Sequence, residues 1–260
     1  MHHPTLCFRP ALRVTALCAA AWLSLPTTAL AQDVHALLVA ADRFRMGADR
    51  LQIETQVNVV NADGTPDKER RYRVFAQGHR QSLVLMQSPA EKGQKVLMLG
   101  DDFWLLMPES QRPLRITPMQ KLLGDASTGD IATMAWVGDY DASLVGSEPC
   151  EAGKPTAPCW HLQLQARRSA VSYQRIELWL GKAHGEPVRA DLYVRSDKLA
   201  KQARFVMDRP DAPTTVTEMV LSDQVSHHKT THIRYLSRKE RQVPQEWLNP
   251  MFLVRNPALD

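Results

Sequence analysis

From residue 51 onward, apolar and polar side chains alternate along most of the chain. In LQIETQVNVV, residues 51–60, every second residue from Leu51 to Val59 faces one way, while Gln52, Glu54 and their counterparts face the other. This period of two is that of a β-strand with one buried face. Similar stretches follow at short intervals, separated by turn sequences such as ADGT. The pattern predicts roughly ten or eleven antiparallel strands joined by short turns.

Little helix is available to cover the apolar face of so long a sheet. Apolar residues recur at helical spacing between Asp33 and Met46, with Asp33 near the N-cap, and a second short helix is expected near Ile131–Trp136. PQEWLNPMFL, near the end, reads as a closing helix or packed tail. We therefore predict a mainly β (α+β) fold whose single antiparallel sheet curves into a barrel-like cradle.

The first part of the chain has the features of an export signal. Two arginines precede an apolar run at Val14–Leu25, and a small-x-small site follows at Ala29–Ala31. This arrangement predicts a signal peptide, residues 1–31, cleaved before Gln32. The apolar run is short for a membrane span. We expect a soluble periplasmic product whose one domain is 32–260.

Two cysteines remain after such cleavage, Cys150 and Cys159. The segment between them, EAGKPTAP with its flanks, is rich in turn-forming residues. In an oxidising compartment this arrangement predicts a disulfide at the base of a hairpin tip. A metal site is the weaker alternative, because no Cys or His pair accompanies them at zinc spacing.

Charge and motifs argue against several functional classes. The net charge of +4 falls to about +2 without the leader's arginines, and no basic stripe indicates nucleic acid as a partner. His228 and His232 are about 13 Å apart along a strand, too far to share a metal. Asp130 in GDASTGD is interpreted as a helix cap and not as a calcium ligand. Because hydrolase, zinc-protease and phosphate-loop motifs are absent, we predict no enzyme, no cofactor and no metal.

One connection, LLMPESQRPLRITPMQKLLG at residues 105–124, is unusually apolar for a loop with three prolines. Methionine, which fills irregular apolar space, recurs around it and on later strands. These methionines are Met86, Met98, Met107, Met119, Met134, Met207 and Met219. The pattern predicts a pliable lipophilic cavity with an apolar lid.

The candidates for lining this cavity or its lid are Trp104, Leu106, Met107, Ile116, Met119, Leu122, Leu123, Ile131, Met134 and Trp136. Met119, Leu122 and Leu123 share one helical stripe, which would dock into the empty cradle. Arg112 and Arg115 are candidates for anchoring the lid or for contacting a headgroup. Solvated loop charges are the equal alternative for both arginines.

Two long stretches resemble outer-membrane lipoprotein-sorting proteins of the LolA-like superfamily, in particular its longer relatives. They are GQKVLMLGDDFWLLMPESQRPLRITPMQKLLGDASTGDIA, followed by GDY, and YQRIELWLGKAHGEPVRADLYVRSDKLAKQARF. The resemblance implies an open half-barrel whose concave face is covered by short helices. It also implies a carrier that shields acyl chains of lipoproteins or of another lipid.

The same resemblance implies the partners. Longer relatives often accompany RND-type exporters, so we expect an inner-membrane transporter as partner and a monomeric carrier. The alternative is a periplasmic regulatory sensor of lipid or lipoprotein that binds an anti-sigma factor. Such sensors usually carry an added second domain.

Overall fold

The chain divides into two units, and the fold concerns the second, Asp33–Asp260. The computed structural model describes residue 2 and residues 33–117, 128–132, 135–151, 157–225 and 228–255.

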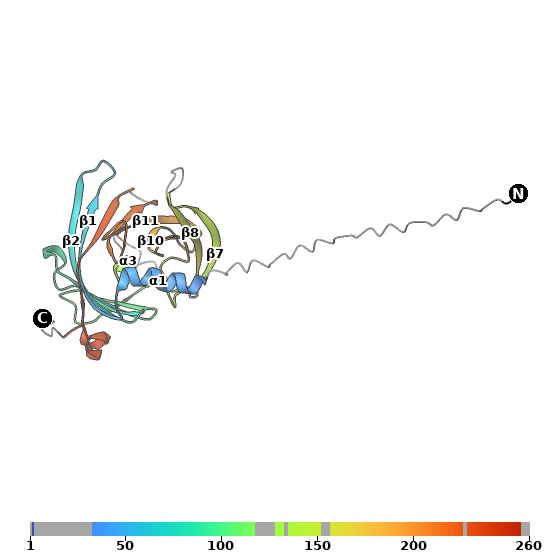
Figure 1. The fold of residues 1–260 in the computed structure, drawn as a ribbon. Helices are drawn as coiled ribbons and strands as arrows, with labels where there is room; N and C mark the ends of the chain where they lie inside the picture. Colours follow the sequence, from blue (N-terminus) through green and yellow to red (C-terminus); the bar gives the residue numbers. More distant parts are fainter. Residues whose placement is uncertain are drawn as a thin grey trace. The chain divides into compact units, whose positions relative to one another are not determined.

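A single antiparallel sheet forms the body of this unit (Figure 1). Its spatial order is β6-β5-β4-β3-β2-β1-β13-β12-β11-β10-β9-β8-β7. The two terminal strands of that order are not paired with each other, so the sheet curves without closing. The strands are β1 (Arg50–Val60), β2 (Pro66–Gln77), β3 (Gln81–Met86), β4 (Lys95–Leu99), β5 (Asp102–Leu106), β6 (Leu114–Ile116), β7 (Tyr140–Pro149), β8 (Pro158–Ala166), β9 (Arg175–Gly181), β10 (Pro187–Tyr193), β11 (Leu199–Met207), β12 (Val216–Asp223) and β13 (Thr230–Glu240).

In the described part of the chain, helices α1 and α3 lie on the concave side of the sheet (Figure 1). Helix α1 (Val34–Met46) begins after Asp33, whose side chain accepts a hydrogen bond of 3.1 Å from the N–H of Ala36. It packs Leu38 and Ala41 into the same apolar cluster as Ile53 of β1. Helix α3 (Thr128–Ala132) contributes to that cluster too. The predicted open half-barrel with helices on its concave face is confirmed.

The second helix ends earlier than the sequence pattern predicts. Trp136 follows α3 instead of belonging to it. Its backbone N–H donates to the carboxylate of Asp42 at 2.8 Å and is therefore not bonded to a helical carbonyl. A contact from another element thus sets the backbone path here.

The convex side carries a separate apolar cluster. Two 3-10 turns, η2 (Gln245–Leu248) and η3 (Pro250–Phe252), cover β2 to β5, and Trp247 meets the ring of Phe75 edge-on at 5.1 Å. The Nζ of Lys95 donates to the backbone oxygen of Leu253 at 3.0 Å. The predicted closing segment is thus a packed tail of short turns. A third short turn, η1 (Pro89–Glu91), connects β3 to β4.

Four charged side chains join turns from opposite ends of the strand order. Arg80, between β2 and β3, lies 2.6 Å from Asp101, between β4 and β5. Arg168, after β8, lies 2.7 Å from Asp101, and Arg80 lies 3.4 Å from Asp139, which precedes β7. Arg168 also binds Asp139. We call this group the ionic clasp, since it links the two ends of the open sheet.

None of the helices in the described part of the chain is long and apolar enough to cross a membrane.

Candidate functional site

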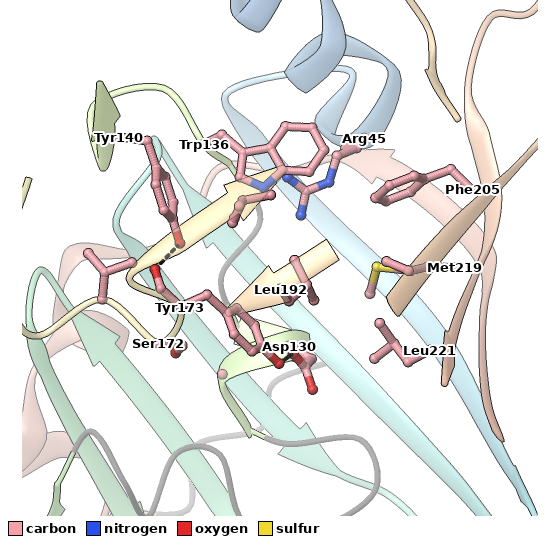
Figure 2. A pocket seen from close by; sticks show the side chains of 14 residues that line it. Arg45, Asp130, Trp136, Tyr140, Ser172, Tyr173, Leu192, Phe205, Met219 and Leu221 are labelled. Carbon is pink, nitrogen blue, oxygen red and sulfur yellow. Dashed lines mark hydrogen bonds between the residues drawn. The ribbon is translucent and has the colours of Figure 1, made fainter. Parts of the chain in front are cut away.

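A narrow pocket lies in the concave cluster, between the sheet and its helical cover (Figure 2). Its cavity volume is about 50 Å³. The pocket is therefore a seam that is nearly filled by side chains. Its apolar lining comes mainly from β9 to β12 and comprises Trp136, Val171, Ile176, Leu192, Ala203, Phe205, Met219 and Leu221.

Aromatic rings and one cation close the upper part of the pocket. Trp136 meets Phe205 edge-on, with ring centroids 5.8 Å apart. Arg45 reaches down from α1, and its guanidinium carbon lies 3.9 Å from the centroid of the Trp136 ring (Figure 2). Such a contact favours a cation at an aromatic face. The pocket thus has an apolar floor and a positively charged group at its roof.

Asp42 fixes the segment after α3 to helix α1. Its carboxylate accepts from the backbone N–H groups of Trp136 and Val137, each at 2.8 Å, and lies 3.4 Å from Arg45. Burial raises the pKa of Asp42, and Arg45 and the two N–H donors only partly offset this. The contact between α1 and the tryptophan is therefore a polar one within an apolar cluster.

Asp130 fixes helix α3 to the sheet. Its carboxylate pairs with the Nζ of Lys201 on β11 and accepts from the hydroxyl of Tyr173 at 2.6 Å. The side chains of Lys201 and Asp130 are only 8% and 2% exposed. Losing one partner of such a buried pair is much more costly than replacing both. The predicted capping role of Asp130 misses this ion pair.

Buried tyrosines complete the polar contacts of the pocket. Tyr140 donates its hydroxyl to the backbone oxygen of Tyr173 at 2.9 Å. Burial raises the pKa of Tyr140, with the charge of Asp139 adding to the effect. The phenol is therefore neutral and acts as a hydrogen-bond donor. The pocket is thus an apolar cleft, and the hydrogen bonds around it hold α3 and the segment after it in place.

A family model described as "-like: Uncharacterized protein" matches residues 78–255. A solved LolA superfamily protein from Nitrosomonas europaea is 27% identical, with a TM-score of 0.74 over 83% of this chain and 97% of that one. The chain belongs to the LolA-like superfamily.

Two further solved structures share the LolA-like fold at lower identity. A DUF1329 family protein from Desulfovibrio piger is 22% identical, with a TM-score of 0.67 over 84% of this chain and 97% of that one. An outer membrane lipoprotein-sorting protein domain from Vibrio parahaemolyticus is 16% identical, with a TM-score of 0.66 over the same shares. No curated protein matches the chain. These likenesses establish the fold of this LolA-like chain.

Some of the predicted cavity residues meet at the concave cluster of the LolA-like chain. Trp136 lines the pocket, Ile131 is buried in the same cluster, and Ile116 packs against it. Trp104 and Leu106 belong instead to the convex cluster with Trp247. Their neighbours Phe103 and Leu105 face the concave side, because successive side chains of β5 point to opposite faces.

Other predicted residues are exposed or lie outside the described part of the chain. Met107 is 38% exposed, and Arg112 is exposed in the loop before β6. Arg115, on β6, pairs with Asp102 at the surface. The predictions for the apolar lid and for one cavity methionine, residues Met119, Leu122, Leu123 and Met134, concern positions outside the described residues.

Sequence reasoning missed most of the pocket lining, including Arg45 and Phe205, and it missed Lys201, which pairs with the lining residue Asp130. For Phe205 the alternation along its strand did carry a signal. In the stretch AKQARFVMD the period of two puts Ala203 and Phe205 on one side, and both line the pocket. Met219 was the methionine whose expected role in a cavity agrees with its position. Charged residues on a core face are expected to be exposed, so Arg45 and Lys201 gave no such signal.

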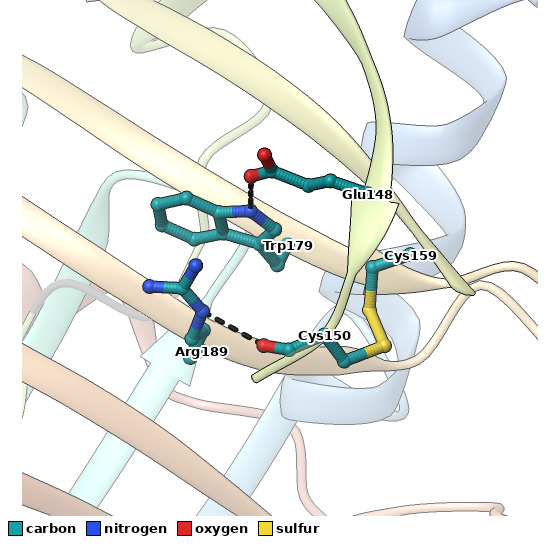
Figure 3. The surroundings of a disulfide bond; sticks show 5 residues. All are labelled: Glu148, Cys150, Cys159, Trp179 and Arg189. Carbon is teal, nitrogen blue, oxygen red and sulfur yellow. Dashed lines mark hydrogen bonds between the residues drawn. A yellow bond between two sulfur atoms is a disulfide. The ribbon is translucent and has the colours of Figure 1, made fainter. Parts of the chain in front are cut away.

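The predicted disulfide between Cys150 and Cys159 is confirmed, with Cα atoms 5.0 Å apart (Figure 3). It lies on the convex side of the β7–β8 hairpin, beside buried Trp179. Arg189 stacks on Trp179 at 3.3 Å, and Glu148 accepts from its indole N–H. The bridge thus belongs to a small cluster away from the pocket.

No group of three or more potential metal ligands is found within the described residues. His232, considered above as a ligand, places its Nδ1 2.6 Å from a carboxylate oxygen of Glu218. His227 lies outside the described residues.

Proposed function

We propose that this LolA-like chain is a carrier that shields acyl chains of lipoproteins or of another lipid. The observation that carries the proposal is the apolar seam between β9–β12 and a helical cover. Asp130 fixes that cover to Lys201 of the sheet, and Asp42 joins helix α1 to the segment after α3. An apolar chain that enters the seam has to displace the cover, and it then packs against the apolar side chains of β9 to β12.

The energetics fit a ligand that is held and then released. Burying one methylene group contributes about 0.8 kcal/mol, so a long acyl chain gains roughly 10 kcal/mol in gross terms. Because side chains already fill most of the seam, part of this gain is offset by moving Trp136 and Phe205 apart. The net affinity is then low enough for transfer to an acceptor.

A substitution that fills the seam tests the proposal. Ala203 on β11 is 2% exposed and lines the pocket. We expect Ala203→Phe to weaken binding of the neutral dye N-phenyl-1-naphthylamine by at least about tenfold, since excluding two or three methylene equivalents costs about 2 kcal/mol. Val206→Phe is the matched control, because Val206 is on the same strand and 44% exposed. Circular dichroism checks that both variants fold.

Native mass spectrometry of protein purified from its natural source gives the second readout. We expect lipid to co-purify with the unmodified chain and with the Val206→Phe variant, but not with the Ala203→Phe variant. Equal lipid and dye binding by all three folded proteins would show that the seam is ordinary core, and turnover of the bound lipid would indicate an enzyme instead.

The finer parts of the proposal have other grounds. The periplasmic location rests on the predicted signal peptide. The RND-type exporter or other inner-membrane transporter as partner rests on the family resemblance, and the monomeric state is a further expectation. The regulatory sensor stays the alternative prediction. Crosslinking in the native envelope, followed by identification of the captured protein, tests these points, since a transporter supports the carrier and an anti-sigma factor supports the sensor.

A further inference from the structure

Strand β13 contains one extra residue that changes which side chains face the pocket side. Thr55 of β1 is opposite Tyr235, but the next residue back, Glu54, is opposite Ser237. Leu236 therefore has no partner on β1 and forms a β-bulge. Its side chain is 52% exposed.

The bulge turns an arginine toward the concave side. Ile53 and Thr55 are buried on that side, and residues directly opposite each other in an antiparallel pair share a face. Tyr235 and Arg238 are their partners, so both face the concave cluster although they are three residues apart. Without the extra residue, alternation would put Arg238 on the convex side.

Arg238 is held in place without a carboxylate. It donates to Thr215 Oγ1 at 3.1 Å and to the backbone oxygen of Val216 at 2.7 Å, and it stacks 4.3 Å from the ring centroid of Tyr235. Its Nε is buried and has no hydrogen-bond partner among the described residues. Among the described residues no carboxylate acts on it, and Arg45 and Tyr235 are the charged or titratable groups that do. Arg238 is itself partly exposed, but its buried Nε is a donor that a ligand can satisfy.

The second cation of the region is Arg45 at the roof of the pocket. Thr215, which accepts from Arg238, donates to the backbone oxygen of Phe44, next to Arg45. Thr215 thus places Arg238 beside the end of α1 that carries Arg45. Burial lowers the pKa of Arg238, Tyr235 opposes this, and the positive charge of Arg45 adds to it.

Among the described residues, the carboxylates next to Arg45 and Lys201 already have partners. Asp42 accepts from two backbone N–H groups and lies beside Arg45, and Asp130 pairs with Lys201. Arg238 is bonded to a hydroxyl and a backbone oxygen instead of to a carboxylate. A cation of this kind beside an apolar seam fits an anion attached to an apolar chain.

Building on the proposed carrier function, we propose that Arg45 and Arg238 form the headgroup site for an anionic amphiphile. The carboxylate or phosphate of the ligand lies between the two guanidiniums, and its chain lies in the seam lined by Phe205 and Met219. Arginine suits this role because its planar group binds carboxylate and phosphate through paired hydrogen bonds. The free Nε of Arg238 supplies one such donor.

Displacement of N-phenyl-1-naphthylamine from the delipidated mature chain at pH 8 tests the proposal. The competitors are laurate, dodecyl phosphate, 1-dodecanol and inorganic phosphate, all below micelle-forming concentrations. We expect laurate and dodecyl phosphate to bind at least about tenfold more tightly than 1-dodecanol, the range of a charge-assisted hydrogen bond. This preference should weaken as salt rises. Inorganic phosphate should neither displace the dye nor compete with laurate.

Variants assign the preference to the bulged strand. Arg238→Gln should remove the advantage of laurate over 1-dodecanol and leave 1-dodecanol binding within about threefold of its original value. Arg234→Gln is the matched control, since Arg234 lies on the same strand, is 53% exposed and already pairs with Glu218. Arg234→Gln should change the affinity for neither laurate nor 1-dodecanol.

The comparison in the unmodified chain does not depend on any variant folding. If laurate and 1-dodecanol bind it equally, the headgroup site is wrong while the carrier function stands. If neither binds, the carrier function itself is wrong. If inorganic phosphate competes as strongly as dodecyl phosphate, the site binds free anions, and the proposal that it binds an anionic amphiphile is wrong. A folded Arg238→Gln that keeps the preference for laurate would also overturn the assignment.

Discussion

The two faces of the sheet are covered in different ways. On the convex face, η2 and η3 pack apolar side chains such as Trp247 directly onto β2 to β5, and the disulfide packs beside Trp179. On the concave face, the two helices also bury apolar side chains, but their attachment depends on buried charged groups, Asp42 and Asp130. Both faces are thus sealed by apolar contacts, but the concave cover is in addition held by buried charged groups.

The two kinds of contact differ in how easily a ligand can displace the cover. Apolar packing is lost gradually as surfaces separate, and nothing in the sheet replaces it. A buried hydrogen bond or ion pair is lost as a unit, and its groups can be satisfied by other partners. A face that has to open for a ligand is therefore better covered by the second kind of contact. Substitutions on the two faces should separate stability from ligand binding.

The largest effect is expected on the convex face. Trp247→Ala removes a side chain that is 6% exposed and packed edge-on against Phe75. We expect the free energy of unfolding to fall by about 4 kcal/mol, the range for a buried tryptophan. Denaturant unfolding measures it, and dye binding by the folded fraction should not change. A change in affinity would show that the two faces are coupled.

A smaller loss of stability with a gain in binding is expected on the concave face. Lys201→Met removes the cation that pairs with buried Asp130 and should cost about 3 kcal/mol. Because α3 is then held less firmly, dye should bind more tightly or faster at temperatures where the variant is folded. Combining it with Asp130→Asn should restore most of the stability, since the uncompensated charge is gone. Loss of stability without any effect on binding would make α3 a permanent part of the core.

The smallest of the three effects is expected at the disulfide. Replacing Cys150 and Cys159 by serine removes a loop closure across a sequence separation of 9, which contributes about 2.5 kcal/mol in the chain-entropy model. The bridge lies on the convex side, so lipid and dye binding should be retained. Thermal unfolding with and without reductant measures the loss in the unmodified chain. Weaker dye binding by the folded serine variant would extend the influence of this cluster to the pocket.

Alternation in the sequence predicts the sheet well, because one-sided burial leaves a period of two in every long strand. It also predicts faces correctly where one side is polar, as in β9, where Ile176 and Leu178 face the core and Trp179 faces away. It fails on β5, because both faces of that strand are apolar. Phe103 belongs to the concave cluster and Leu106 to the convex one, and no local pattern distinguishes them.

The candidate site was harder to predict because it depends on register between distant strands. The bulge at Leu236 is defined only by the pairing of β13 with β1, so alternation along β13 alone gives Arg238 the wrong face. Asp42 likewise looks like an ordinary polar position of a helix, and its role comes from the backbone of Trp136, far away in the sequence. The disulfide was predictable because both cysteines flank one local hairpin.

The ionic clasp gives the open sheet an unusual mechanical property. Neighbouring strands of the sheet are joined by ladders of backbone hydrogen bonds. The gap between its two ends is bridged by the side chains of Arg80, Asp101, Asp139 and Arg168. Although partial burial opposes it, contact with Arg168 and Arg80 lowers the pKa of Asp101 and so favours its charged form. Dissolved salt screens these ion pairs but leaves the amide ladders intact. We therefore expect the separation of the two ends of the open sheet to respond to the ionic strength of the surrounding fluid.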